Sequence, residues 1–330
     1  MNKRIEWIDF GKGVTIMIVV LGHVVLGLLQ SNRFLDGQNK GLLLAVEMTY
    51  VFHMPVFFAL SGFFFKGYDN TRSYLLSMKS KMISLGVPYI TFSIIMFIMK
   101  KIGESSVRNE TSIKSLLSIY KLPMDHLWFL YTLMGIFLYV GFLSLVIKNS
   151  KVLFAISIIG FLIVNIYPVP IYLIQRTLVW LPLFMLGNIL REIKFAKKAA
   201  YLFGLGYIIY ISIWMLVNFK TRISYSLPGV WAIILPISVL LAFSVFPLFK
   251  KGKIYDYFIR CGNVSLPIYL IHVPVVSVTR IALFKVGVTN LTLHVVIGML
   301  TGWFLTILLF RISQKIRFLD FFFYPIRYLR

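Results

Sequence analysis

Three histidines stand inside long apolar stretches of the sequence, at His23, His53 and His272. An ionisable side chain in the middle of a bilayer costs at least about 2.5 kcal/mol on insertion scales, so such residues usually serve a function. A neutral imidazole can take a proton from a hydroxyl group as a general base, or attack a carbonyl as a nucleophile. These positions indicate chemistry on an alcohol inside a membrane. The alternative is that each histidine is a packed residue bonded to a backbone carbonyl.

Asp9 and Lys12 precede His23 at spacings that place all three on one side of a helix. At 100° per residue they fall within about 60° of one another. The stripe would run from the inner membrane surface to the middle of the bilayer, which favours a path for a polar reactant. We therefore group His23, Lys12 and Asp9 as catalytic candidates. Interfacial anchoring is the alternative explanation for Lys12 and Asp9.

Membrane spans must position these residues, because the composition excludes a soluble globular enzyme. The chain is 59% hydrophobic and 14% charged, against about 25% charged in soluble domains. Its net charge of +23 comes from basic residues that lie between apolar runs, which favours a membrane over nucleic acid as partner. One cysteine, Cys261, cannot form an intrachain disulfide framework or a cysteine-rich metal site.

A bilayer core of about 30 Å requires roughly 20 apolar residues per helix. On this criterion the sequence predicts an all-α, polytopic membrane protein with about ten transmembrane helices. We expect residues 1–330 to form a single domain without an appended soluble module. By helix rise, the three histidines lie roughly 15–16 Å from the ends of their spans and so near mid-depth. The predicted spans are 12–31, 42–65, 83–99, 126–147, 152–169, 171–190, 201–218, 229–248, 262–284 and 291–312.

The distribution of Lys and Arg predicts that both termini are cytoplasmic. With the N-terminus inside, the inner segments carry about twice as many basic residues as the outer loops, as the positive-inside rule requires. The loop 100–125 departs from the rule, because it is basic and would lie outside.

Motifs along the chain occur in a recognisable order. Ile8-Asp9-Phe10-Gly11-Lys12-Gly13 stands at the entry to the first span, which then carries Val19-Val20-Leu21-Gly22-His23, and the second span carries Phe52-His53-Met54-Pro55 with Leu60-Ser61-Gly62-Phe63. Later segments are His126-Leu127-Trp128-Phe129-Leu130 and Ile268-Tyr269-Leu270-Ile271-His272-Val273-Pro274. This series resembles the integral-membrane acyltransferase-3 family, particularly its fucose 4-O-acetylase-like members.

The resemblance implies transfer of an acyl group, usually acetyl from acetyl-CoA, to a hydroxyl of a cell-surface carbohydrate at the bacterial cytoplasmic (inner) membrane. It makes His23 the essential histidine, as base or as acyl carrier. Lys12 stands where relatives often carry Arg, and the two cations are not equivalent. The chain lacks the Gly-Asp-Ser block of an esterase-like domain that some relatives append. Either the protein acetylates its acceptor directly, or a separate protein completes the transfer.

Substrate sites can be proposed on both sides of the membrane. Basic residues between the second and third spans suit the phosphates of coenzyme A, although the positive-inside rule explains them equally well; they are Lys66, Arg72, Lys79 and Lys81. Polar and aromatic residues at the outer ends and within the spans are candidates for the acceptor or for a pore; they are Glu47, His53, Ser61, His126, Trp128, Arg176 and His272.

The sequence has no zinc-binding His-Glu-x-x-His, no nucleotide-binding loop and no Gly-x-Ser-x-Gly elbow. We therefore expect no metal and no permanently bound cofactor, with acetyl-CoA as a substrate. Expected partners are a surface glycan or lipid-linked oligosaccharide, membrane lipids and the polysaccharide synthesis machinery. Two alternatives stay open: an exporter of polysaccharide or lipid-linked sugar, and an assembly subunit without catalysis.

Overall fold

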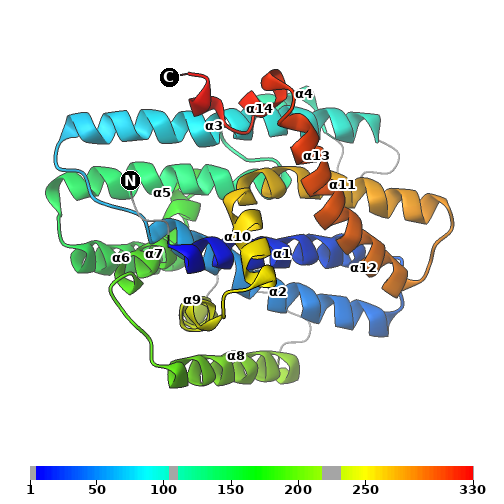
Figure 1. Cartoon of the computed structure of the whole chain (residues 1–330), viewed down its shortest axis with the longest axis horizontal. Helices are drawn as coiled ribbons and strands as arrows, with labels where there is room; N and C mark the ends of the chain where they lie inside the picture. The colour runs from blue at the N-terminus through cyan, green and yellow to red at the C-terminus, as the bar shows by residue number, and fades with distance from the viewer. Residues whose placement is uncertain (1–4, 104–110, 218–231, 330) are drawn as a thin grey trace.

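The computed structural model describes residues 5–103, 111–217 and 232–329. Every regular element in these ranges is helical, and the long helices lie along the longest axis of the molecule (Figure 1). The first half contains α1 (Glu6–Leu29), α2 (Asp36–Gly62), α3 (Thr71–Ile102), α4 (Ile113–Leu117), the 3-10 turn η2 (Asp125–Leu127), α5 (Trp128–Val146) and α6 (Ser150–Ile166).

The second half begins with α7 (Tyr172–Leu190), α8 (Lys197–Val217) and α9 (Ile234–Val245), which the turn η4 (Phe246–Leu248) extends. The remaining elements are α10 (Lys253–Asn263), α11 (Ser265–Lys285), α12 (Leu291–Leu300), the π-helical turn η5 (Thr301–Leu305), α13 (Thr306–Ser313), α14 (Arg317–Phe321) and the turn η6 (Pro325–Arg327).

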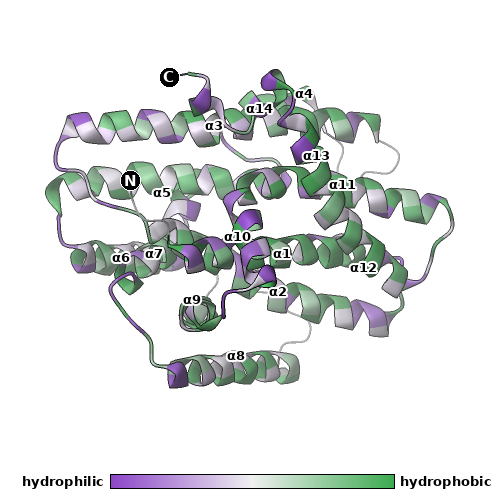
Figure 2. Ribbon diagram, viewed as in Figure 1, coloured by the Kyte–Doolittle hydropathy of each residue, from purple (hydrophilic) through white to green (hydrophobic). Residues whose placement is uncertain are grey.

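The arrangement is that of an all-α polytopic membrane protein. In the part of the chain that the structure describes, eight helices are long and apolar enough to cross a bilayer. The segments Ser150–Ile166 and Ile234–Leu248 are apolar but shorter. Apolar residues dominate the long helices, whereas hydrophilic ones gather at helix ends, in connections and on α10 (Figure 2). The ten predicted spans correspond to these ten apolar segments, while the number of crossings and the side of the termini stay predictions.

Several helix boundaries differ from the predicted spans. Helix α1 begins at Glu6, not at residue 12, and so includes Asp9 and Lys12. Helix α3 has 32 residues because Asn70 caps it well before the apolar part, its side chain accepting a hydrogen bond from the Ser73 backbone at 2.9 Å. For the predicted span 229–248, residues 229–231 lie outside the described ranges. Helix α9 is seen end-on in Figure 1, whereas α1 runs horizontally, so the two helices point in different directions.

Helix α10 was not predicted as a separate element. It crosses α1 at a contact where glycines let the two backbones touch (Figure 1). A Cβ atom on Gly262 would lie 1.8 Å from the Asp9 carbonyl oxygen, and one on Gly13 would lie 2.0 Å from the Phe258 carbonyl oxygen. This crossing fixes α11, which follows α10 directly, beside α1.

Candidate active site

Four of the five histidines meet inside the helical bundle, although they come from α1, α2, η2 and α11. The Nδ1 atom of His23 lies 3.3 Å from the Nε2 atom of His272. The His126 ring centroid is 5.5 Å from that of His272 and 6.1 Å from that of His23. His53 joins the group through Tyr50, whose ring centroid is 4.6 Å from His53 and 5.8 Å from His23. We call His23, His53, His126 and His272 the imidazole cluster.

The members of the imidazole cluster differ in exposure. His53, His126 and His272 are buried, whereas His23 is partly exposed. The ring nitrogens of His53 and His126 form no hydrogen bond of normal geometry with a described residue, although backbone groups lie near them, of Thr49 at His53 and of Tyr269 and Leu270 at His126. Buried polar atoms are normally hydrogen-bonded, so these loosely held nitrogens are suited to receive hydroxyl groups of a ligand. In the described ranges, no group of three or more His, Cys, Asp and Glu side chains is placed to hold a metal ion.

The turn η2 directs His126 into the cluster. Its first residue, Asp125, has a positive φ of 43°, which is uncommon for a residue other than glycine. An ion pair with Lys100 at 2.8 Å holds the Asp125 carboxylate, and the Tyr269 hydroxyl donates a hydrogen bond to the His126 carbonyl. The sequence had suggested His126 only as an outer acceptor contact; the structure places it beside His23 and His272.

Asp9 and Lys12 lie on α1 with His23, as the spacing predicted. The Lys12 Nζ is 4.0 Å from an Asp9 carboxylate oxygen and 5.2 Å from the centroid of the Phe64 ring. Lys12 is eleven residues from His23, which corresponds to about 16 Å along the helix. It therefore does not touch the imidazole cluster, and any role it has concerns a part of the substrate distant from His23.

The basic candidates for donor binding do not share one environment. Lys66, Arg72 and Lys79 are exposed in the connection before α3 and along its first turns. Lys81 instead lies over the Phe137 ring of α5, with its Nζ 3.6 Å from the ring centroid. The first three remain available to an anionic ligand, while Lys81 is engaged in a packing contact.

Among the acceptor candidates, Arg176 and Trp128 lie together. The Arg176 guanidinium carbon is 5.5 Å from the Trp128 ring centroid and 5.1 Å from that of Tyr172. Ser61 donates its hydroxyl to the Phe57 carbonyl at 2.8 Å within its own helix. Glu47 is buried on α2. Arg176 and Trp128 thus form a cationic and aromatic group, whereas Ser61 and Glu47 lie apart from it along α2.

Tyrosines next to the cluster were missed in the sequence. Tyr50 lies three residues before His53, and Tyr269 lies three before His272, so each pair shares a helix face. The Tyr269 ring centroid is 5.1 Å from that of His126. The spacing of three residues was a usable signal, since a residue three positions before a histidine lies on the same helix face and so next to its imidazole.

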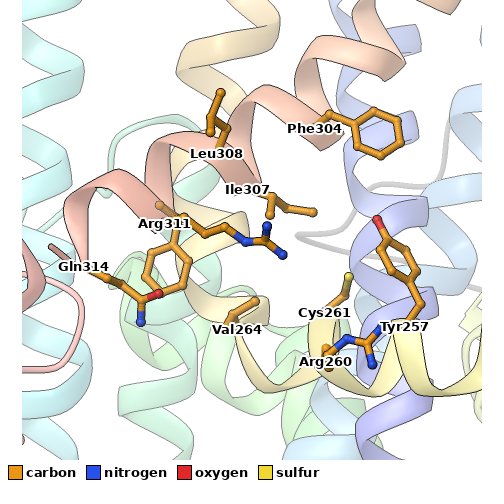
Figure 3. Close-up of a pocket in the computed structure, with 10 residues that line it drawn as sticks. Tyr257, Arg260, Cys261, Val264, Phe304, Ile307, Leu308, Arg311 and Gln314 are labelled. Carbon is orange, nitrogen blue, oxygen red and sulfur yellow. The ribbon is translucent and has the colours of Figure 1, made fainter.

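A separate pocket lies between α10 and α13 (Figure 3). It has a volume of about 460 Å³, apolar walls that include Val264 and Ile307, and two arginines, Arg260 and Arg311. Cys261 forms part of its wall, and burial raises the pKa of this thiol above its ordinary value. No residue of the imidazole cluster lines this pocket.

The model of the acyltransferase-3 family, described as an acyltransferase domain, matches residues 5–311. The chain belongs to this family. The matched range contains the whole imidazole cluster, together with Asp9 and Lys12, so the helices that carry the cluster are those of the family's acyltransferase domain. The resemblance seen in the sequence motifs is thereby confirmed.

Two relatives are nodulation proteins. The chain is 26% identical over 186 residues to nodulation protein NolL of Sinorhizobium fredii (strain NBRC 101917 / NGR234), which covers 56% of this chain and 48% of that protein. It is 28% identical over 99 residues to nodulation protein NolL of Mesorhizobium japonicum (strain LMG 29417 / CECT 9101 / MAFF 303099), covering 30% of this chain and 26% of that one. The matched stretches span about half the length of the first relative and about a quarter of the second. No solved structure matches the chain.

Proposed function

We propose that this protein transfers an acetyl group from cytoplasmic acetyl-CoA to a hydroxyl of a cell-surface polysaccharide, or of its lipid-linked precursor, in the bacterial cytoplasmic membrane. The observation that carries the proposal is the partly exposed His23 in contact with the buried His272 inside the acyltransferase domain. An imidazole within the membrane can receive an alcohol from one side and a thioester from the other. The family membership supports acyl transfer rather than export as the chemistry of this cluster.

In the proposed reaction, His23 takes the proton of the acceptor hydroxyl while the hydroxyl oxygen bonds to the acetyl carbon. The carbon–sulfur bond of the thioester breaks, and the proton passes from His23 to the leaving thiolate. General base catalysis of this kind typically contributes about 10²- to 10⁴-fold to the rate. A covalent acyl-histidine at His23 is the alternative route, and it requires the same imidazole in the same place.

The surrounding residues suggest how each substrate is held. The cation of Lys12, which Asp9 holds on α1, and the exposed Lys66, Arg72 and Lys79 suit the phosphates of the donor. Arg176 and Trp128 suit a sugar, because an aromatic face packs against a pyranose ring and a guanidinium donates several hydrogen bonds.

The test is the proton NMR spectrum of the host's surface polysaccharide from three strains: wild type, a deletion, and the deletion complemented with His23→Ala. We expect O-acetyl signals to disappear in both mutants while polymer yield stays normal. His294→Ala provides a matched control, because His294 is buried on α12 outside the imidazole cluster. Normal acetylation with little polymer outside the cell would refute the enzyme and favour an exporter.

A further inference from the structure

The hydrogen bonds around His272 determine which of its nitrogens carries the proton. Its Nδ1 lies 3.0 Å from the backbone carbonyl oxygen of Ile268, one turn earlier in α11. A carbonyl oxygen only accepts hydrogen bonds, so Nδ1 must be the protonated nitrogen. A neutral imidazole has one N–H group, and the Nε2 atom of His272 therefore presents a lone pair. That lone pair faces His23.

The same reasoning applies to His23. Its Nδ1 lies 3.1 Å from the Val19 carbonyl oxygen and 3.3 Å from the Nε2 of His272. Both neighbours are acceptors, and one is contributed by its own helix while the other comes from α11. Two acceptors facing one nitrogen require a proton there, which leaves the Nε2 of His23 without one.

We infer that His272 is a positioning residue, which joins the Val19 carbonyl in holding the proton of His23 on Nδ1 and so makes Nε2 of His23 the reactive atom. The inference rests on the proposed function, because it names the residue that orients the proposed base. When Nε2 takes the proton of the acceptor hydroxyl, His23 becomes an imidazolium, and its Nδ1–H group donates to His272 and Val19. The charge is then stabilised by contacts already in place before the reaction.

A purely structural role for His272 predicts equal losses of activity when either glutamine or asparagine replaces it. A positioning role predicts that the two variants differ. The amide of glutamine reaches about as far as Nε2 of histidine, whereas the shorter amide of asparagine reaches about as far as Nδ1. His272→Gln can therefore keep an acceptor near Nδ1 of His23, while His272→Asn can replace only the bond to Ile268. Both variants remove the same ring from the core.

The first experiment measures acetyl transfer by the purified full-length protein with each variant. We expect His272→Gln to keep kcat within about tenfold of wild type and His272→Asn to lower it by about a hundredfold, with KM for both substrates unchanged. His294→Gln is the control, since its Nε2 contacts the Val288 carbonyl at 2.8 Å away from the cluster. Equal losses in the two His272 variants, or a change confined to KM, overturn the positioning role.

The second experiment needs no turnover and therefore separates the two proposals. Nitrogen NMR of wild-type protein labelled with ¹⁵N-histidine distinguishes a protonated from a bare ring nitrogen, and His23→Ala identifies the signals of His23. We expect Nδ1 of His23 to be protonated and Nε2 bare at neutral pH. The reverse pattern refutes the inference even if acetyl transfer is found. The expected pattern in a protein without acetyl transfer leaves the geometry standing and refutes the proposed function.

Discussion

At the scale of single residues, the four imidazoles of the cluster are not equivalent. His23 combines partial exposure with a buried imidazole partner, whereas His53 and His126 are buried and form no hydrogen bond of normal geometry with a described residue. The exposure of an imidazole decides whether a substrate can reach it. Its hydrogen-bonding neighbours decide which ring nitrogen carries the proton. The histidine that we propose as reactive is thus distinguished by its surroundings, not by its residue type.

The sequence predicted the depth of three cluster members, because span boundaries and helix rise give a height in the membrane. It did not place His126 with them. That histidine reaches the cluster through the left-handed backbone of Asp125 and the bond from Tyr269, and neither leaves a pattern in hydropathy. Local backbone reversals of this kind depend on tertiary contacts.

Substitutions of Lys12 can show whether its charge on α1 contributes to substrate binding or to the stability of the fold. A partly exposed pair such as Lys12 and Asp9 contributes at most about 1 kcal/mol to stability. We therefore expect Lys12→Met to leave thermal unfolding nearly unchanged while it lowers acetyl transfer at least about tenfold, and Lys12→Arg to retain most activity. Unfolding followed by fluorescence and a donor titration measure the two effects. Loss of stability in proportion to activity would assign Lys12 to the fold alone.

Arg176 is predicted to act on the acceptor. A cation between two aromatic rings contributes about 0.5–2 kcal/mol. Arg176→Gln removes the charge and the stacking fork, and we expect the acceptor KM to rise several-fold with little change in the donor KM. Arg33→Gln is the control, because Arg33 also lies over an aromatic ring, Phe284, outside the cluster. An equal effect on both KM values would contradict an acceptor role.

At the scale of elements, hydropathy predicted the apolar helices but not α10. This helix has only 11 residues and carries charged groups, so it does not meet the length and polarity required of a span. Its place is set by backbone contact at Gly13 and Gly262, which a search for apolar runs does not detect. Hydropathy did not predict the orientation of α9 either, since it records the length and polarity of a segment but not the direction in which the helix runs.

Gly262 tests the crossing of α10 over α1. In Gly262→Ala the new Cβ would collide with the Asp9 carbonyl, so we expect a loss of several kcal/mol or failure to accumulate in the membrane. Gly41→Ala is the matched control in α2, because nothing lies within 4 Å of the added atom. Alanine there should be neutral or stabilising by up to about 1 kcal/mol. Size-exclusion profiles before and after heating compare the two.

Cys261 reports on the same helix without any substitution. Its thiol is buried, and burial raises its pKa, so at a given pH the reactive thiolate is scarcer than in an exposed cysteine. We expect maleimide to label the folded protein slowly at neutral pH, faster as pH rises, and quickly after unfolding. Lys250→Cys in a Cys261→Ser background supplies the exposed reference. Equal rates at the two positions would contradict the packing of α10.

At the scale of the whole molecule, the number of membrane crossings can be tested with paired cysteines. If both α8 and the short segment Ile234–Leu248 cross, positions 197 and 250 lie on the same, inner side, as the distribution of basic residues predicts. Lys197→Cys and Lys250→Cys, each in the Cys261→Ser background, should then be protected from an impermeant maleimide in intact spheroplasts. Labelling of one position alone would show that only one of the segments crosses.

His23 and His272 stand 249 residues apart in the chain. During synthesis, α1 enters the membrane long before α11 leaves the ribosome, so the contact between the two imidazoles forms near the end of translation. A nascent chain therefore has His23 in the membrane without its His272 partner until α11 is in place. Any interruption of translation before α11 should yield fragments in which His23 is inserted but this contact is missing.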